Sequence, residues 1–566
     1  MMDRAAPHIM GLAPIALRAP DTVMRLARMG SAHPTRLSFL RILLRRIEIE
    51  GWRFERRIFD LDENGVGYAV YCLHGPKRSY SLVAFAHDLP ADQRSDRVIA
   101  TAWDATFTLF DGIPTADDIT RLSANVPLQE AGRISPRELS LSRANRSVRL
   151  FDHVVARLAT GQQPERDALD EVGYLMRTTA VYGSSKFGAA ENADIATRPE
   201  LCAPFQAEMM SVWLTRSFTI DLVNHLARAK GGAEATTLAP ALARSLGVGN
   251  STGLGMAPFL VRHPALLDAW VRVRETALAR VRGQRRMSEA DLRSLIAGCE
   301  AARDTGATWR SNHPVQLAKL ADLRGDLEKL HHHLTTGRGH CVKDLPWNAI
   351  WHWGEAHLSL EGQEMLLSIL LEPCGAVIDD LEMSLRSDEP PAPPIEGQAR
   401  LGDLRRAIEG RYDWALSYDF STQEARARFW YVSEEKLEPR LGARFEEEGA
   451  TREAPLGIAY LIRQAYDAMA AYPDATPAYA FLLAHPEHRQ ILRRLQWLAG
   501  RDYGEIRENL IGADILPIDM MRYKLAFFGA NHFDPRSDKW LRISLFAGQV
   551  FPEHICAPAH RGADAA

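Results

Sequence analysis

Two kinds of hydrophobic pattern alternate along the chain. Within residues 57–115, the runs GYAVYCLHG, RSYSLVAFAHD and DRVIATAWDATFTLFDG are rich in Val, Tyr, Phe and Thr and partly alternate between apolar and polar positions. This region is therefore predicted to form antiparallel strands joined by hairpins.

Residues 1–56 precede it as a basic segment, in which SFLRILLRRIEI has the apolar spacing of a helix. That helix either docks its Leu and Ile face on the protein body, which we favour, or lies on an anionic membrane.

The pattern changes after residue 115. From 116 to 385, apolar residues recur every three or four positions, as in FQAEMMSVWLTRSFTIDLVNHLARA, and predict a long helical domain. Residues 386–399 contain SDEPPAPPIEGQ, where four prolines in five positions exclude a helix and predict a linker. Residues 400–445, with RYDWALSYDFS and EARARFWYVSE, are predicted to be a second strand region. Residues 446–566 are predicted to be a second helical region with a terminal strand.

One short phrase occurs twice, as AVYGSSKF and as AFFGANHF. Aligning the two glycines, Gly183 and Gly529, matches Ala180 with Ala526, Tyr182 with Phe528, and Phe187 with Phe533. The expected fold class is therefore α+β and predominantly helical, with two pseudo-repeated halves that each place an antiparallel strand element before a helical region. The alternative is that a short aromatic and glycine match arises by chance in a long chain.

Composition narrows the functional classes. The chain has 566 residues, so more than one domain is expected, and its net charge of −4 argues against a nucleic-acid partner. Its six cysteines include no CxxC pair, which suits reduced thiols in a cytoplasm. No run approaches the roughly 20 apolar residues that span a bilayer, and no apolar core leads into a cleavage site. We expect a cytoplasmic protein without membrane insertion or an organic cofactor.

The repeated phrase supplies the first candidate chemistry. A glycine after an aromatic residue permits a tight turn, which Tyr182 can anchor. The first copy places Ser185 and Lys186 at the tip, whereas the second places His532 there. Ser185 is a candidate nucleophile, Lys186 a candidate base or anion partner, and His532 a candidate proton carrier. A solvent-exposed turn without chemistry is the competing interpretation.

A glycine-rich stretch supplies the second candidate site. LGVGNSTGLGMAPF has four glycines in nine positions before an apolar helix pattern, so its amides and the side chains of Asn250, Ser251 and Thr252 are predicted to bind a carboxylate or phosphate. It lacks the GK[ST] of a Walker loop and the third glycine of a dinucleotide fingerprint. A close helix crossing is the structural alternative. Arg177 and Arg522, just before the two corner glycines, are predicted to clamp the anion or to form surface ion pairs.

Histidines could in principle bind a metal ion. His352 and His357 are five residues apart, which places them on different faces of one helix. A site in which His331, His340, Glu355 or His357 come together in the fold to bind one metal ion stays open, but no metal site is predicted.

The segment GSSKFGAAEN resembles the serine-rich loop of the fumarase and aspartase type lyases, whose pattern is GSS followed by Met, Pro and Lys. Here Met and Pro are missing, and Lys186 follows the serines directly. The resemblance implies at most that a lyase reaction is compatible with the sequence.

The functional hypothesis is a cytosolic enzyme that acts on a small anionic, carboxylate-type molecule by proton abstraction, elimination or hydrolysis, at a site between two related halves. The alternative is a noncatalytic binding or scaffolding protein. A homo-oligomer is compatible with both.

Overall fold

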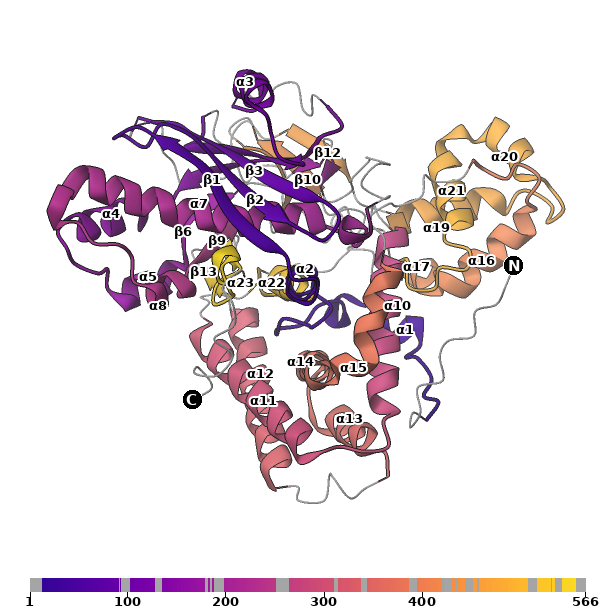
Figure 1. Ribbon diagram of the computed structural model, residues 1–566. Coiled ribbons are helices and arrows are strands. Elements are labelled where there is room, and N and C mark those ends of the chain that lie inside the picture. Colours follow the sequence, from indigo (N-terminus) through magenta and orange to yellow (C-terminus); the bar gives the residue numbers. More distant parts are fainter. Residues whose placement is uncertain are drawn as a thin grey trace.

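A computed structural model describes residues 13–90, 92, 102–127, 135–178, 182–183, 186–187, 198–250, 264–309, 314–336, 344–385, 394–419, 421, 429–433, 436–442, 451–455, 458–506, 517–530, 532–534 and 542–555. It is a mixed α+β protein that is mostly helical, with one large, mostly antiparallel sheet (Figure 1). The predicted α+β, mainly helical class is thereby confirmed.

The first five strands form an antiparallel meander in chain order. They are β1 (Arg53–Leu61), β2 (Gly67–His74), β3 (Ser79–Ala86), β4 (Ala105–Asp111) and β5 (Glu138–Arg146). Their apolar residues alternate between two faces, as a period of two requires. One face carries Val70, Val83 and Phe85 and is covered by α3 (Ala116–Asn125), while the other packs on the main core.

The sheet then continues with strands from distant parts of the chain, in the order β6, β9, β14, β13. These are β6 (Tyr174–Thr178), β9 (Gly247–Asn250), β14 (Arg542–Leu545) and β13 (His532–Asp534). β6 and β9 are parallel, whereas the other paired strands that the structure describes are antiparallel. The region 116–385 is therefore not purely helical, because β5, β6 and β9 lie within it. Two of them have only four or five residues, too few for a strand period to stand out.

Helix α7 (Gln206–Gly231) crosses the face of the sheet opposite α3 (Figure 1). Its first half is buried on all sides, including Trp213, because the sheet lies on one side and other helices on the rest. Helix α2 (Phe39–Ile49) and helix α22 (Pro517–Phe528) lie between the sheet and a lower bundle (Figure 1). Segments near the two ends of the chain thus meet in the centre of the molecule.

The lower bundle consists of α10 (Pro264–Arg282), α11 (Glu289–Thr308), α12 (Pro314–Thr336), α13 (Pro346–His357) and α14 (Leu360–Leu371). It shares one continuous hydrophobic core with the sheet, and Trp270, Trp347 and Trp351 are buried in it. No helix of the described chain is both long and apolar enough to cross a membrane.

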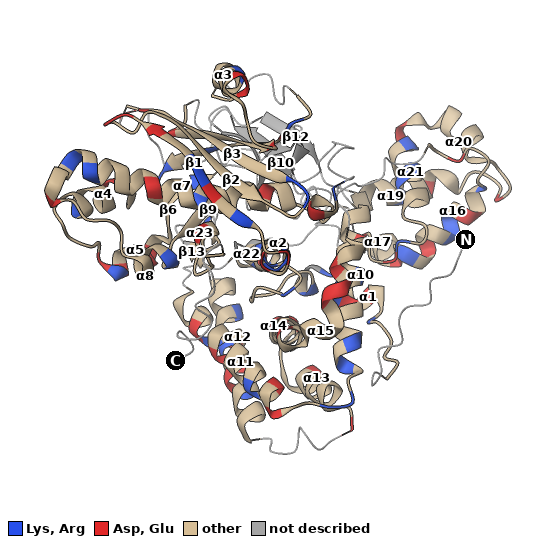
Figure 2. Cartoon of the chain, viewed as in Figure 1, with Lys and Arg blue, Asp and Glu red and all other residues tan. Residues whose placement is uncertain are grey.

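A smaller helical unit has its own core. It contains α16 (Leu401–Arg411), α17 (Asp413–Ser417), α19 (Ile458–Met469), α20 (Ala478–Ala484) and α21 (Arg489–Trp497). Figure 2 shows basic and acidic residues interspersed over this unit and the bundle. The prediction of a strand for RYDWALSYDFS was wrong, because Arg411 ends one helix and Asp413–Ser417 form the next. Leu404, Ile408, Tyr412 and Ala415 are buried at helical spacing, a pattern that competed with the β-rich composition.

The second predicted strand of that region has a different outcome. EARARFWYVSE contains β10 (Phe429–Ser433), which pairs with β11 (Lys436–Gly442) and β12 (Thr451–Pro455) in a separate three-stranded sheet.

The described chain gives no evidence of two repeated halves. Gly183 ends β7 (Tyr182–Gly183), which pairs with β8 (Lys186–Phe187) in a hairpin beside β5. Gly529 instead follows the last residue of α22 with φ of 82° and ends that helix. Gly529 thus needs the positive φ that glycine tolerates, whereas Gly183 lies in a strand, so the shared phrase does not correspond to a shared structure.

Candidate functional site

The parallel pair of β6 and β9 brings two of the predicted motifs together. Thr178 pairs with Asn250, and both strands end at this row. The carboxyl ends of neighbouring parallel strands lie at the same edge, which is where open sheets bind ligands. Ser251 and Thr252 directly follow Asn250 in the chain, and they lie outside the described residues.

Asn250 is held by a lysine that the sequence analysis did not select. Lys524 on α22 donates a hydrogen bond from Nζ to Oδ1 of Asn250 at 2.9 Å, and both side chains are buried. They line a cavity of about 20 Å³ between α7, α22 and β14. The other lining residues are Phe205, Glu208, Met209, Val212, Phe528, Ile543 and Leu545.

Glu208 is the second ionisable group of this cavity. It lies in the first turn of α7, and 6% of its surface is exposed. Burial among apolar side chains raises its pKa to about 7, and a backbone hydrogen bond opposes the shift. The carboxyl group therefore changes its charge near neutral pH, as a general acid or base requires.

Arg177 lies on the opposite face of the sheet from Asn250. It pairs with Gly249, one residue before Asn250, and successive side chains of a strand point to opposite faces. Burial and the nearby charge of Arg542 lower the pKa of Arg177 to about 10. Arg177 and Asn250 therefore belong to the same pair of strands but do not converge on one ligand.

His532 is packed away from the strand ends. A Cβ atom added to Gly173 would lie 2.2 Å from Cδ2 of His532, so the imidazole fills the space over that glycine. Burial lowers the pKa of His532, and the ring stays neutral at pH 7.

Lys186 does not share this position. Residues that pair across neighbouring strands form rows that run across the sheet. Phe187, the neighbour of Lys186, lies in the same row as Leu141 on β5, whereas His532 lies in the same row as Asn145 on β5. Four residues along a strand span about 13 Å, and β8 and β13 occupy columns two strands apart. The backbone rows and columns of the sheet thus do not bring β8 beside β13, and a meeting of the Lys186 and His532 side chains stays a prediction. The backbones of Tyr182 and Lys186 are described but not their side chains, and Ser185 lies outside the described residues.

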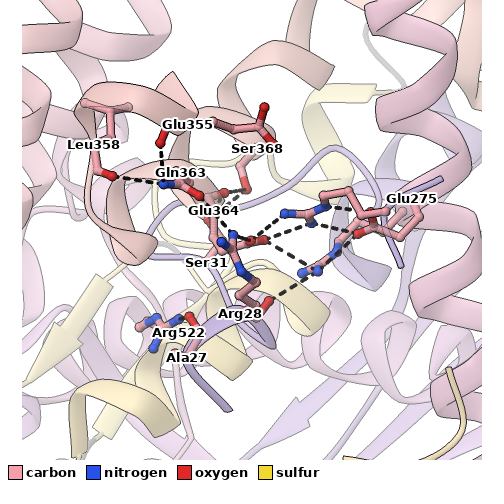
Figure 3. Close-up of polar contacts among 12 residues, drawn as sticks. Ala27, Arg28, Ser31, Glu275, Glu355, Leu358, Gln363, Glu364, Ser368 and Arg522 are labelled. Carbon is pink, nitrogen blue, oxygen red and sulfur yellow. Dashed lines mark hydrogen bonds and ion pairs between the residues drawn. The ribbon is translucent and has the colours of Figure 1, made fainter. Parts of the chain in front are cut away.

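Arg522 binds the protein itself. Its guanidinium donates to the carbonyl oxygen of Ala27 at 2.6 Å and pairs with Asp519 at 3.1 Å (Figure 3 shows the Ala27 contact). This arginine fixes the N-terminal segment to α22 instead of presenting its charge to a ligand.

Beside Arg522 lies a buried ionic network around Glu364 (Figure 3). Arg18 bridges Glu364 and Glu275, with contacts of 2.8 Å and 2.7 Å, and Arg28 and Arg274 also approach Glu364. Burial alone would raise the pKa of Glu364, but Arg18 and Arg274 lower it to about 2. Because the charges satisfy one another, we assign this network a structural role in joining residues 18–31 to the bundle.

The histidines named in the sequence analysis have local partners. His331 contacts Glu300 at 3.2 Å, and Glu355 contacts His352 at 2.8 Å. The ring of His357 bonds to the carbonyl oxygen of Trp353 at 2.7 Å. His340 lies outside the described residues.

Sequence reasoning missed Glu208 and Lys524. Glu208 is a lone charge within the apolar run FQAEMMSVWL, and Lys524 directly precedes the apolar run LAFF. Such a charge cannot face water if the helix is buried on all sides, and this signal could have identified both residues. In comparisons with known proteins, no family, no curated protein and no solved structure matches the chain.

Proposed function

We propose that the protein is an enzyme that acts on a small organic anion of the carboxylate type and uses Glu208 to move a proton beside Lys524 and Asn250. The observation that carries the proposal is a single cavity lined by an ammonium, an amide and a carboxyl group with a pKa of about 7. The cavity lies at the carboxyl end of β9, which is part of the glycine-rich stretch. It replaces the expected site between two related halves.

Glu208 supplies the proton chemistry. A group whose pKa is close to the ambient pH is populated in both forms, so it can accept a proton in one step and return it in the next. Desolvation, which causes the raised pKa, also strengthens every electrostatic interaction inside the cavity.

Lys524 and Asn250 supply binding and charge compensation. The hydrogen bond between them fixes the direction of the ammonium group. A fixed positive charge in an apolar cavity stabilises negative charge that develops on a substrate more strongly than the same charge does in water.

The size of the cavity favours hydrolysis among the three expected reactions. A volume of about 20 Å³ has room for one water molecule beside Glu208. In this reaction, the Glu208 carboxylate takes a proton from water while the water oxygen bonds to the electrophilic carbon of the substrate. Glu208 then returns the proton to the leaving group as the bond to that group breaks.

A screen of small carboxylates by thermal shift tests the proposal, because a ligand that binds the folded state raises the apparent stability. Ligands found with the wild type are then incubated with the protein, and products are followed by mass spectrometry. We expect Glu208→Gln to bind these ligands without turnover and Lys524→Met to lose binding. Lys319→Met is the matched control, since Lys319 pairs with Asp519 outside the cavity. Turnover by Glu208→Gln at the wild-type rate would exclude the assigned role.

A noncatalytic binding protein is the second candidate, favoured by a cleft between the N-terminal segment and the small helical unit. The cleft has a volume of about 300 Å³, within the range of small-molecule sites. Asp21, Arg411, Trp414 and Glu505 are among its lining residues. Ligand binding that is lost in Trp414→Ala but retained in Lys524→Met would favour this function.

A further inference from the structure

The small helical unit carries a cluster of metal-ligating side chains that do not line the cavity. Helix α20 ends just before His485, a short 3-10 turn follows at Pro486–His488, and α21 begins at Arg489. The sequence HPEH thus places two imidazoles and one carboxylate on a single turn. Among the described residues, His485, Glu487 and His488 offer three ligand atoms that lie within 4.8 Å of one another.

The two imidazoles converge on one carboxylate oxygen. Nδ1 of His485 lies 3.4 Å from Oε1 of Glu487, and Nε2 of His488 lies 3.9 Å from the same atom. Ligands at about 2.1 Å from a tetrahedral ion are about 3.4 Å apart. His485 and Glu487 already have this separation. The Glu487 side chain is 60% exposed and can rotate to bring its oxygen closer to the ring of His488.

The surroundings fix the orientation of both rings. The hydroxyl of Tyr472 is 3.1 Å from Nε2 of His485, which leaves Nδ1 facing Glu487. Metal-bound histidines commonly have such a partner on the second ring nitrogen. Both rings also pack on Phe481, with centroid distances of 4.9 Å for His485 and 5.8 Å for His488.

An ordinary surface ion pair does not account for this arrangement. At His153, one imidazole meets one oxygen of the Glu165 carboxylate at 2.9 Å, and Arg157 contacts the other oxygen at 3.1 Å. At Glu487 a second imidazole faces the same oxygen, and 9% of the His488 side chain is exposed. Two imidazoles that pack on Phe481, with one carboxylate beside them, form a ligand set for a cation.

We propose that His485, Glu487 and His488 bind a divalent transition-metal ion. Two nitrogens and one oxygen suit Zn²⁺, and three protein ligands leave a coordination position open to water or to an external ligand. The site is independent of the proposed hydrolytic cavity, and either can exist without the other.

Titration of the metal-free full chain with Zn²⁺ alone, followed by calorimetry, tests the proposal. We expect Glu487→Gln and His485→Asn each to lose one equivalent of bound Zn²⁺, or at least tenfold in its affinity. Tyr472→Phe keeps all three ligands but removes the outer partner of His485, and we expect a loss of about 10- to 100-fold in affinity. His153→Asn is the matched control and should bind as the wild type does.

Co²⁺ provides a second readout, because its visible spectrum reports nitrogen and oxygen ligation at low coordination number. The wild type should give this spectrum and Glu487→Gln should not. His488→Asn also disturbs packing, whereas Glu487 is exposed and its substitution leaves the fold intact. Equal Zn²⁺ stoichiometry and affinity in the wild type, Glu487→Gln and His485→Asn would overturn the proposal.

Discussion

Lys524 donates a hydrogen bond to Asn250 across 2.9 Å, joining two residues that are 274 positions apart in the chain. This contact ties α22 to the last residue of β9, at the row where β6 also ends. Because both side chains are buried, the polar pair forms one wall of a cavity that is otherwise mostly apolar. The position of Glu208 in the same cavity makes this the best candidate for chemistry in the described structure.

The hydrogen bond between Lys524 and Asn250 can be tested through stability. We expect Asn250→Ala to lower the free energy of unfolding by about 1–3 kcal/mol, since a buried ammonium loses an acceptor. Asn348→Ala is the matched control, because Asn348 accepts from Arg282 at 2.9 Å in a less buried place. Urea denaturation of both variants measures the difference. An equal or larger loss in Asn348→Ala would contradict the importance of the buried contact.

The raised pKa of Glu208 predicts a pH dependence of stability. Folding raises the pKa of this carboxyl group, so the folded state binds its proton more tightly than the unfolded state does. Its contribution to the free energy of unfolding is complete below the unfolded-state pKa. The contribution is lost as the pH rises through the folded-state pKa. For Glu208 the window runs from 4.5 to about 7, because burial raises the pKa. We therefore expect the stability of Glu208→Gln relative to the wild type to increase by about 3 kcal/mol between pH 4.5 and pH 8. Denaturation at several pH values measures this, and a constant difference would contradict it.

The network around Glu364 predicts the opposite pH dependence. Burial raises the pKa of Glu364, but the arginines outweigh it and lower the pKa to about 2, so the contribution is present above pH 4.5 and lost as the pH falls toward 2. At pH 7, Glu364→Gln should cost about 3–5 kcal/mol, because Arg18 and Arg274 lose a buried partner. Glu355→Gln, next to the exposed His352, should change stability by less than about 0.5 kcal/mol. Similar losses in the two variants would argue against a structural network.

The packing of His532 on Gly173 can be separated from backbone strain. Gly173 has φ of 75°, and an added Cβ would lie 2.2 Å from the imidazole, whereas Gly51 has φ of 66° with no atom within 4 Å of an added Cβ. Both alanine substitutions carry the strain of positive φ, but only Gly173→Ala also meets a clash. We expect Gly173→Ala to lower the melting temperature clearly more than Gly51→Ala. Equal effects would show that His532 is not packed there.

The sequence predicted the class of the fold better than its topology. The N-terminal runs with strand alternation and the helical spacing after residue 200 both correspond to observed elements. The sheet order was not predictable, because β9 is only GVGN and pairs with β6 and β14, which are far away in the chain. Likewise, the apolar residues of RYDWALSYDFS fit both the strand period and the helix period. The segment forms a helix because Tyr412 and Ala415 pack in the core of the small helical unit.

Prediction of the site was limited by the same long-range contacts. Asn250 was selected from a glycine-rich pattern and does line the cavity, but its partner Lys524 belongs to a helix from the other end of the chain. Arg522 was selected for its place before a glycine, yet its side chain binds Ala27 and Asp519. Local spacing can propose polar residues, but it cannot tell which of them the fold uses for its own stability.

The most direct test of the account is an NMR titration of Glu208 with a ¹³C-labelled side-chain carboxyl, assigned by its loss in Glu208→Gln. We expect a midpoint near pH 7, because the carboxyl is buried in an apolar cavity. A midpoint near 4.5, the value of an exposed glutamate, would contradict the proposed role of Glu208 in proton transfer.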